Sequence, residues 1–252
     1  MTKILMPQRA ILAGLRELHY RRIVGGAALD EVGRLRSTAF DAKDIYTEKF
    51  GNSVIEDYDF APNAHVFGLY RADDLIATLR VNVACRDCPN TPAVDTFPNE
   101  LRPMIDQGFR FVDPGRLAVD PKLVDTLPAL PMYMLRTASI VTLKLNVENC
   151  LAVVREHHEK FYRSVLRAVR IAGPKNPGNT FAKLSLISMS AAHTALIQSR
   201  YPVFNFLDSE AQQLTDLVPS ERDTSDPIWP TAAEASGIDQ NESDDAALTS
   251  VA

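Results

Sequence analysis

The sequence is poor in cysteine and has no long uninterrupted apolar run. Cys85, Cys88 and Cys150 are its only cysteines among 252 residues, and a low, odd number argues against a disulfide scaffold. No stretch approaches the apolar length that a membrane-spanning helix needs. The apolar run at the N-terminus is short and is interrupted by Pro7 and Arg9, which argues against a secretory signal peptide. These absences predict a soluble, cytoplasmic protein.

Motifs of several common enzyme classes are also missing. The sequence has no recognisable serine triad, dinucleotide-binding loop or Walker motif. Cys85 and Cys88 form a single C-x-x-C, whereas a structural zinc site wants four ligands and no second pair follows. The pair precedes Pro89 instead of opening a helix as a thioredoxin-type motif does. We therefore predict no metal site, no bound cofactor and no nucleic-acid partner.

Charge is unevenly distributed along the chain. Residues 219–252 contain eight acids and one base, so this segment has a net charge of −7. Because the whole chain has a net charge of −5, residues 1–218 have a net charge of +2. We predict a folded domain over residues 1–218 and a disordered acidic tail over 219–252. Residues 150–200 hold eight bases against two acids. A basic surface there would suit an acidic partner, although a solvated helix face explains the same charges. The candidate contacts are Arg155, Lys160, Arg163 and Arg167.

Hydrophobic periodicity predicts an α/β fold. Helices are expected over residues 9–21, 27–40, 99–107, 131–148 (the longest), 157–168, 191–199 and 208–217. Strands are expected over residues 64–71 and 74–84, joined as a hairpin, and over 109–119, 150–155, 169–172 and 181–189, with a loop over 85–98. Hairpins are antiparallel and strand–helix–strand units are parallel. The order therefore predicts a mixed, mostly antiparallel central sheet with helices on both faces.

Pro114 and Gly115 interrupt the strand predicted over residues 109–119. Proline cannot donate a ladder hydrogen bond, so the pair indicates a β-bulge. A bulge exposes backbone N–H groups and redirects neighbouring side chains, here Asp113 and Arg116.

Five short motifs occur in the order found in N-acyl amino acid synthases and the related acyl-homoserine lactone synthases, over roughly residues 10–200. They are Arg36 and Phe40, as in R-x-x-x-F; Glu56 and Asp59 in EDYD, similar to D-x-x-D; Arg80 in TLRV, like L-R; Asp113 and Arg116 in VDPGR, like E-x-x-R; and the segment FYRSVLRAVRIAGP, which resembles the helix-to-strand step near the C-terminus. Asp113 stands where the lactone synthases favour Glu, and Glu56 stands where they favour Asp. The negative charges are therefore kept, but the lengths of the two side chains differ. The resemblance implies a GNAT acyltransferase fold.

The resemblance further implies transfer of a medium or long acyl chain from a thioester to the α-amino group of an amino acid. The amine must lose a proton, and Asp113 is the first candidate to accept it, before Glu56 and Asp59. Arg80 and Arg116 are expected on neighbouring strands, where they would bind the acceptor's carboxylate. Arg36 and Phe40 complete the substrate-binding set. Ion pairs that merely brace the sheet would use the same acids and arginines.

The acyl donor is expected to be an acyl carrier protein. Most coenzyme A-dependent GNAT enzymes hold the pyrophosphate on a glycine-rich loop after the bulged strand. Residues 120–131 read DPKLVDTLPALP and contain no glycine, which makes acyl-CoA the less favoured donor. The basic stretch would suit an acidic carrier protein, and the lipid product could bring the enzyme to the membrane periphery.

An apolar slot for the acyl chain is expected where the two central strands of this fold diverge. Its candidate residues have a spacing that is more often typical of plain core, which is the preferred interpretation for most of them: Met132, Met134, Leu135, Ile140, Leu143, Leu151, Val153, Phe161 and Leu166. No cysteine or serine looks activated, so direct attack of the amine is expected. The alternatives are an acyl-homoserine lactone synthase that uses S-adenosylmethionine, and a non-catalytic GNAT-like module that binds carrier protein. An ordinary acetyltransferase is disfavoured by the missing glycine-rich loop.

Overall fold

The computed structural model describes residues 14–42, 51–177, 182–207, 210–211 and 214. The predicted acidic tail and its boundary at residue 218 lie outside the described residues. The same is true of most of the helix predicted over residues 208–217 and of the first part of the one predicted over 9–21.

Seven strands of the described residues form one sheet in the order β1-β2-β3-β4-β5-β7-β6. Neighbouring strands are antiparallel except β4 and β5, which are parallel. The predicted mixed, mostly antiparallel sheet is therefore confirmed. The strands are β1 (Leu18–Ile23), β2 (Ala64–Arg71), β3 (Asp74–Ala84), β4 (Phe111–Val119), β5 (Asn149–Arg155), β6 (Val169–Lys175) and β7 (Leu184–Ser190).

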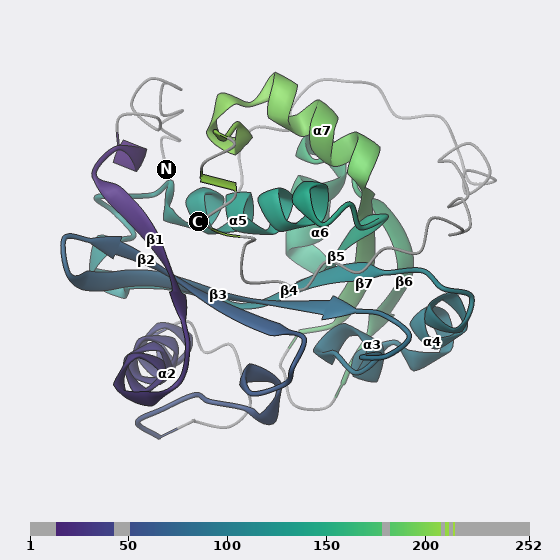
Figure 1. Cartoon of the computed structure of the whole chain (residues 1–252), viewed down its shortest axis with the longest axis horizontal. Helices are drawn as coiled ribbons and strands as arrows, with labels where there is room; N and C mark the ends of the chain where they lie inside the picture. The colour runs from purple at the N-terminus through teal and green to yellow at the C-terminus, as the bar shows by residue number, and fades with distance from the viewer. Residues whose placement is uncertain (1–13, 43–50, 178–181, 208–209, 212–213, 215–252) are drawn as a thin grey trace.

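Helices cover both faces of this sheet, as predicted (Figure 1). One face carries α5 (Leu130–Lys144), α6 (Glu156–Val165) and α7 (Ala191–Arg200), and the other carries α2 (Gly26–Asp41), α3 (Pro92–Thr96) and α4 (Pro98–Asp106). Short 3-10 turns lie at η1 (Asp57–Asp59), η2 (Pro121–Leu123) and η3 (Pro202–Phe204).

Apolar side chains on each helix explain this layering. The largest buried cluster joins α5, through Met134 and Ile140, to Phe67 and Leu79 of the central strands. On the opposite face Leu29 and Val32 of α2 pack against the β1–β2 side of the sheet, and α3 and α4 pack against the start of β4. Each helix thus buries one apolar stripe, as its 3.6-residue period requires.

Three sequence predictions need correction. Leu18–Ile23 is not the end of a helix but the edge strand β1, paired with β2 from Leu18↔Arg71 to Ile23↔Val66. Its half-buried side chains show no clear alternation, so backbone pairing with β2 outweighed a helix-like spacing of leucines. The helix α5 has 15 residues and is one shorter than α2. The predicted loop over 85–98 contains α3, which begins at Pro92 and is capped by the Thr91 hydroxyl, accepting from Val94 N.

The predicted bulge in β4 is confirmed. Thr78 of β3 pairs with Ala118 of β4, but Arg80 pairs with Gly115. A step of two residues along β3 therefore matches a step of three residues along β4, which leaves one extra residue on β4. Arg116 takes up the distortion with a φ of 54°, a left-handed conformation that costs a non-glycine residue about 1 kcal/mol or more.

The strands β4 and β5 diverge beyond the first residues of their pairing. They are joined by two pairs, Phe111↔Asn149 and Val112↔Cys150. Because β4 continues to Val119 and β5 to Arg155, the sheet opens between them, next to the bulge.

Candidate active site

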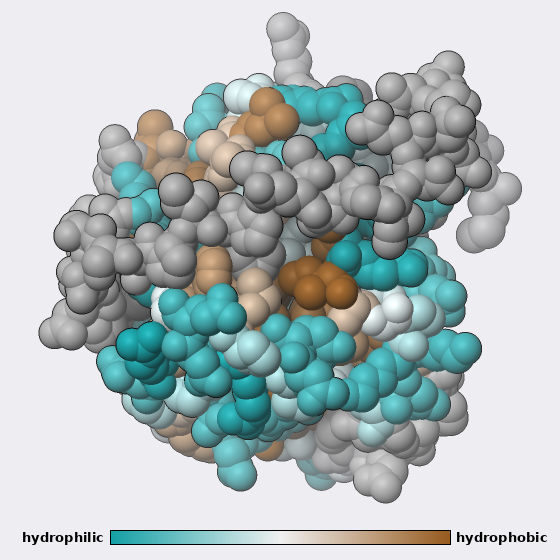
Figure 2. Space-filling view, turned by 90° about the vertical axis from the view of Figure 1, so that its right-hand side faces the viewer, coloured by the Kyte–Doolittle hydropathy of each residue, from teal (hydrophilic) through white to brown (hydrophobic). Residues whose placement is uncertain are grey.

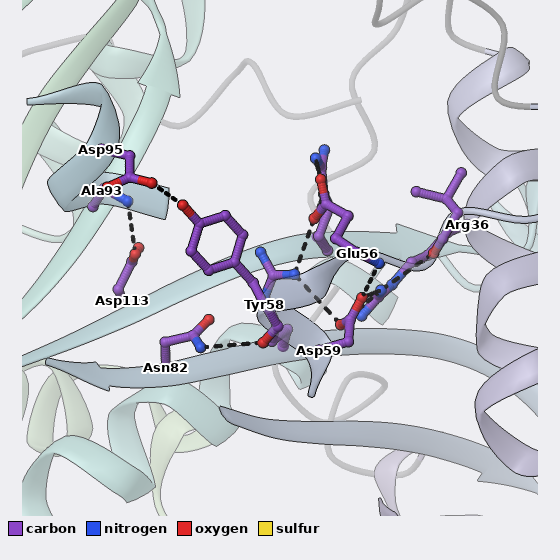
Figure 3. A network of polar contacts seen from close by, with 11 residues as sticks. Arg36, Glu56, Tyr58, Asp59, Asn82, Ala93, Asp95 and Asp113 are labelled. Carbon is purple, nitrogen blue, oxygen red and sulfur yellow. Dashed lines mark hydrogen bonds and ion pairs between the residues drawn. The ribbon is translucent and has the colours of Figure 1, made fainter. Parts of the chain in front are cut away.

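Two acids and three arginines form an ion-pair network below the bulged strand. Arg36 Nη1 donates to both carboxylate oxygens of Asp59, at 2.9 and 2.8 Å (Figure 3). Arg80 Nη1 donates to Glu56 Oε2 at 2.9 Å and lies 3.4 Å from Asp59 Oδ1. Arg116 holds the same Glu56 carboxylate from the other side, through Nε at 2.6 Å and through Nη2. The structure therefore brings five of the predicted site residues together.

Local structure fixes each member of this network. Glu56 directly precedes the turn η1 and Asp59 is its last residue, and the Glu56 backbone N–H donates to Asp59 Oδ2 at 2.9 Å. Arg36 and Phe40 lie four residues apart on α2 and therefore on one face of the helix. Phe40 lies with its ring centroid 6.0 Å from the Arg116 guanidinium carbon. Both predicted helix residues thus face the site.

Burial differs sharply across the network. Arg36, Arg80 and the side chain of Asp59 are almost fully buried, whereas the side chains of Glu56 and Arg116 keep 27% and 16% exposure. Glu56 and Arg116 are thus the end of the network that a substrate could reach.

Within the part of the chain that the structure describes, the network carries an excess of positive charge. Burial lowers the pKa of Arg116 to about 10, with the charge of Arg36 acting in the same direction, so the guanidinium stays charged at neutral pH. Among the described residues, three arginines face two carboxylates, which leaves one positive charge there when both acids are ionised. In addition, Nε and Nη2 of Arg36 and Nε of Arg80 are buried without a hydrogen-bond partner among the described residues. An anionic group bound nearby would offset this unbalanced charge.

Asp113, the first candidate from the sequence, lies in a different environment. Its Oδ2 accepts a hydrogen bond from the backbone N–H of Ala93 at 2.9 Å, and it points away from Glu56 and Asp59 (Figure 3). Burial raises its pKa, opposed by the bonds from Ala93 and Thr91 and by the charge of Arg80. At 3% exposure, Asp113 holds the start of α3 and has little access to a substrate amine.

Tyr58 and Asp95 belong to the same region and were missed by the sequence reasoning. The Tyr58 hydroxyl donates to Asp95 Oδ2, and the ring centroid of Tyr58 lies 5.4 Å from the guanidinium carbon of Arg80. The position of Tyr58 inside EDYD, between the two predicted acids, was the available signal.

An apolar cavity of about 190 Å³ occupies the opening between β4 and β5. Its walls come from the bulge of β4 and from β5, α5, α6, β7 and α7. Of the predicted acyl-slot residues, Leu135, Leu151, Val153 and Leu166 line it. The described walls do not include the other five predicted residues, and two of these, Met134 and Ile140, are fully buried core. The sequence reasoning missed Cys150, Tyr162, Ile187 and Phe204 as lining residues.

Arg116 connects the cavity to the ion-pair network. It lines the cavity through the bulge, and its side chain reaches Glu56. An acyl chain in the cavity and a polar group at Glu56 would therefore meet at the bulge.

Three of the four predicted carrier-binding residues lie at the surface. Lys160 on α6 and Arg167 just after it are exposed, and Arg163 is 59% exposed, 3.7 Å from the buried carboxylate of Glu159. Arg155 at the end of β5 is only partly exposed, and burial lowers its pKa. On the side of the molecule that lies at the right of Figure 1, hydrophilic residues surround a small apolar patch of the described surface (Figure 2).

Other kinds of site find little support in the part of the chain that the structure describes. No three His, Cys, Asp or Glu side chains gather there as potential metal ligands. No helix there has the length and apolarity to cross a membrane.

The bulged strand, the divergence of β4 and β5 and the apolar cavity between them define a GNAT-like acyltransferase. A family model described as N-acyl amino acid synthase FeeM matches residues 31–190. The chain therefore belongs to the FeeM family of N-acyl amino acid synthases. The match confirms the resemblance inferred from the motifs and shows that the protein is an enzyme of the acyltransferase class, which sets aside the non-catalytic alternative.

Solved structures show the same fold. The structure of FeeM, an N-acyl amino acid synthase from uncultured soil microbes, is 19% identical, covers 72% of this chain and 97% of its own, and gives a TM-score of 0.57. The CoA-dependent acyl-homoserine lactone synthase BjaI, solved with MTA, is 13% identical, covers 73% of this chain and 90% of its own, and gives a TM-score of 0.51. A search of curated proteins gave no match.

Proposed function

We propose that this enzyme transfers a medium or long acyl chain from acyl carrier protein, or from acyl-CoA, to the α-amino group of an amino acid. The observation that carries this proposal is the junction at Arg116. One side of this residue lines an apolar cavity, and its side chain joins a network with an excess of positive charge. The cavity suits an acyl chain, and the network suits an acceptor that carries both an ammonium and a carboxylate.

The acceptor's two charges match the two kinds of group at the exposed end of the network. The α-carboxylate would be drawn to the positive charge of Arg116, with the charge of Arg80 behind it. The ammonium would be drawn to Glu56, which would accept its proton directly or through water. Asp59, which no solvent reaches, would orient Arg36 and Arg80. In this assignment Glu56 replaces Asp113 as the acid that handles the amine, and Asp113 supports α3.

The transfer itself is a direct displacement. The free amine attacks the thioester carbonyl and the C–N bond forms, giving a tetrahedral oxyanion. The oxyanion then collapses, the C–S bond breaks, and the thiolate leaves as a thiol with a proton given up by the attacking nitrogen. Backbone N–H groups exposed by the bulge would stabilise the oxyanion. Cys150 lines the cavity, but burial raises the pKa of its thiol to about 12, so it stays protonated and is a poor nucleophile. Direct attack therefore remains our proposal.

Acyl carrier protein is the proposed donor because of charge. Residues 120–131 contain no glycine to hold a pyrophosphate, and Lys160, Arg163 and Arg167 present an exposed basic surface on and after α6. The CoA dependence of BjaI makes acyl-CoA the donor to compare with it. A cytoplasmic site of action belongs to the same proposal.

The test is a purified assay of both donors with a mixture of amino acids, followed by mass spectrometry. Wild-type enzyme should form products with the mass of the fatty acid plus the amino acid minus water, and release one thiol per product. Glu56→Gln should abolish most turnover. Glu17→Gln is the matched control, at an exposed position directly before β1, and it should not change turnover. Acyl-homoserine lactone formed from S-adenosylmethionine would assign the enzyme to the alternative reaction. Absence of any acylated product from folded protein would refute the proposal.

A further inference from the structure

Tyr58 joins two groups of site residues that otherwise belong to separate elements. It lies in η1 between Glu56 and Asp59, and its hydroxyl donates to Asp95 on α3. Figure 3 shows the ring between the Glu56–Asp59 side of the network and the side that contains Asp95 and Asp113.

On the network side the ring of Tyr58 covers Arg80. The guanidinium carbon lies 5.4 Å from the ring centroid, within the range of a cation–π contact. Arg80 is 1% exposed and binds Glu56 at 2.9 Å. The Tyr58 carbonyl accepts from Asn82 Nδ2 at 3.4 Å, which ties η1 to strand β3. The ring is therefore part of the wall that fixes Arg80 against the carboxylate of Glu56.

On the other side Asp95 belongs to a helix of only five residues, α3. So short a helix depends on tertiary contacts for its position. Ala93 of the same helix binds Asp113 at 2.9 Å, and Tyr58 supplies a second connection from η1. Asp95 itself is half-exposed and lies outside the ion-pair network.

We propose that Tyr58, held by Asp95, is a positioning residue for the acceptor half of the reaction. The hydrogen bond to Asp95 holds the ring over Arg80, and Arg80 in turn orients Glu56 toward the acceptor amine. This inference rests on the proposed function, in which Glu56 handles the amine. The phenol acts as a donor throughout, because burial and the bond to Asp95 raise the pKa of Tyr58 to about 12.

The first test is Tyr58→Phe, which removes the hydroxyl and keeps the ring. We expect kcat/KM for the amino acid to fall about tenfold, the effect of losing one hydrogen bond to a charged group, with the KM of the acyl donor unchanged. Tyr20→Phe is the matched control. Tyr20 also donates one hydrogen bond, to the Tyr133 carbonyl at 2.7 Å, and its ring lies 6.0 Å from an arginine, but on strand β1. This control should leave the acceptor kinetics unchanged.

Asp95 variants separate positioning from general destabilisation. Asp95→Ala should reproduce the Tyr58→Phe kinetics, and the double variant should be no worse than either single one, because both remove the same bond. Asp95→Asn keeps an acceptor oxygen and should restore much of the lost acceptor kcat/KM relative to Asp95→Ala. Additive losses, equal losses toward donor and acceptor, or an unaltered Tyr58→Phe enzyme would each overturn the inference.

Hydrogen exchange distinguishes failure of this inference from failure of the proposed function. Exchange at the Ala93 and Val94 amides should be faster in Tyr58→Phe than in wild type or in Tyr20→Phe, whatever reaction the enzyme catalyses. A wild-type enzyme that makes no N-acyl amino acid refutes the proposed function. Unchanged exchange at these amides refutes the connection between η1 and α3.

Discussion

Replacing Asp59 by Asn should destabilise the fold strongly, because Asp59 is the buried counter-ion of Arg36. Both side chains are 0% exposed, and one guanidinium nitrogen donates to both carboxylate oxygens. Asn is isosteric and keeps one acceptor, but it leaves the charge of Arg36 uncompensated inside the protein. Breaking a buried pair in this way costs about 3–5 kcal/mol. Because Asn retains one hydrogen-bond acceptor, we expect Asp59→Asn to lower the free energy of unfolding by about 3 kcal/mol, near the lower end of this range.

Urea denaturation followed by circular dichroism measures this loss directly. The midpoint should fall while the slope m stays constant, because the same surface is exposed on unfolding. A loss of about 3 kcal/mol corresponds to a fall in Tm of roughly 6–12 °C for a chain of this size.

Asp73→Asn is the matched control for this measurement. Asp73 pairs with Arg21 at 3.1 Å, but the two side chains are 96% and 46% exposed, and exposed pairs contribute little. Its midpoint should not move. A loss below about 1 kcal/mol in Asp59→Asn, or an equal loss in both variants, would show that the network is solvated and that our account of its burial is wrong.

Three further predictions concern pH, the cavity and the carrier. Burial lowers the pKa of His65 to about 4. Between pH 6.5 and pH 4 the unfolded chain therefore binds a proton on His65 and the folded chain does not, so about 3 kcal/mol of stability should be lost as the pH falls through this range. In denaturation measurements, His65→Leu should reduce this dependence of stability on pH. Ala138→Leu, which extends a 3% exposed side chain into the cavity wall, should shift the preferred acyl chain to shorter lengths in competition assays; an unchanged preference would place the acyl chain elsewhere. The double change Lys160→Glu and Arg163→Glu should raise the KM for acyl carrier protein about tenfold at low ionic strength, less at high salt; no salt dependence would argue against an electrostatic contact.

Most of the fold could be predicted because its signals are local. The hairpin of β2 and β3 was predicted with the bounds that the structure has, since both strands are β-rich runs separated by two residues. The bulge was predicted from Pro114 and Gly115, which constrain the backbone wherever they occur. Strand β1 was not predicted, because what makes residues 18–23 a strand is the edge of β2, more than 40 residues further along the chain.

The site was predicted as a set of residues but not as an arrangement. Spacing in short motifs brought Arg36, Glu56, Asp59, Arg80 and Arg116 to notice, and the structure brings them together. The same motifs could not show that Asp113 points toward α3. That orientation depends on α3, a helix in a segment that had been predicted as loop, whose Ala93 N–H donates to Asp113.

The two-pair contact between β4 and β5 has a consequence for the local stability of the sheet. Strands β1 to β4 form one antiparallel unit and β5, β7 and β6 form another. Neighbouring strands inside each unit pair at four or more positions, whereas the junction between the units has two pairs. The parallel junction closes a loop of about 40 residues and gains only two backbone pairs for that loss of chain entropy. The cavity exists only once the two units have docked across α5. The active centre therefore lies at the most sparsely paired junction of the described sheet, and amides along this junction should open to exchange at a lower free energy than those inside either unit.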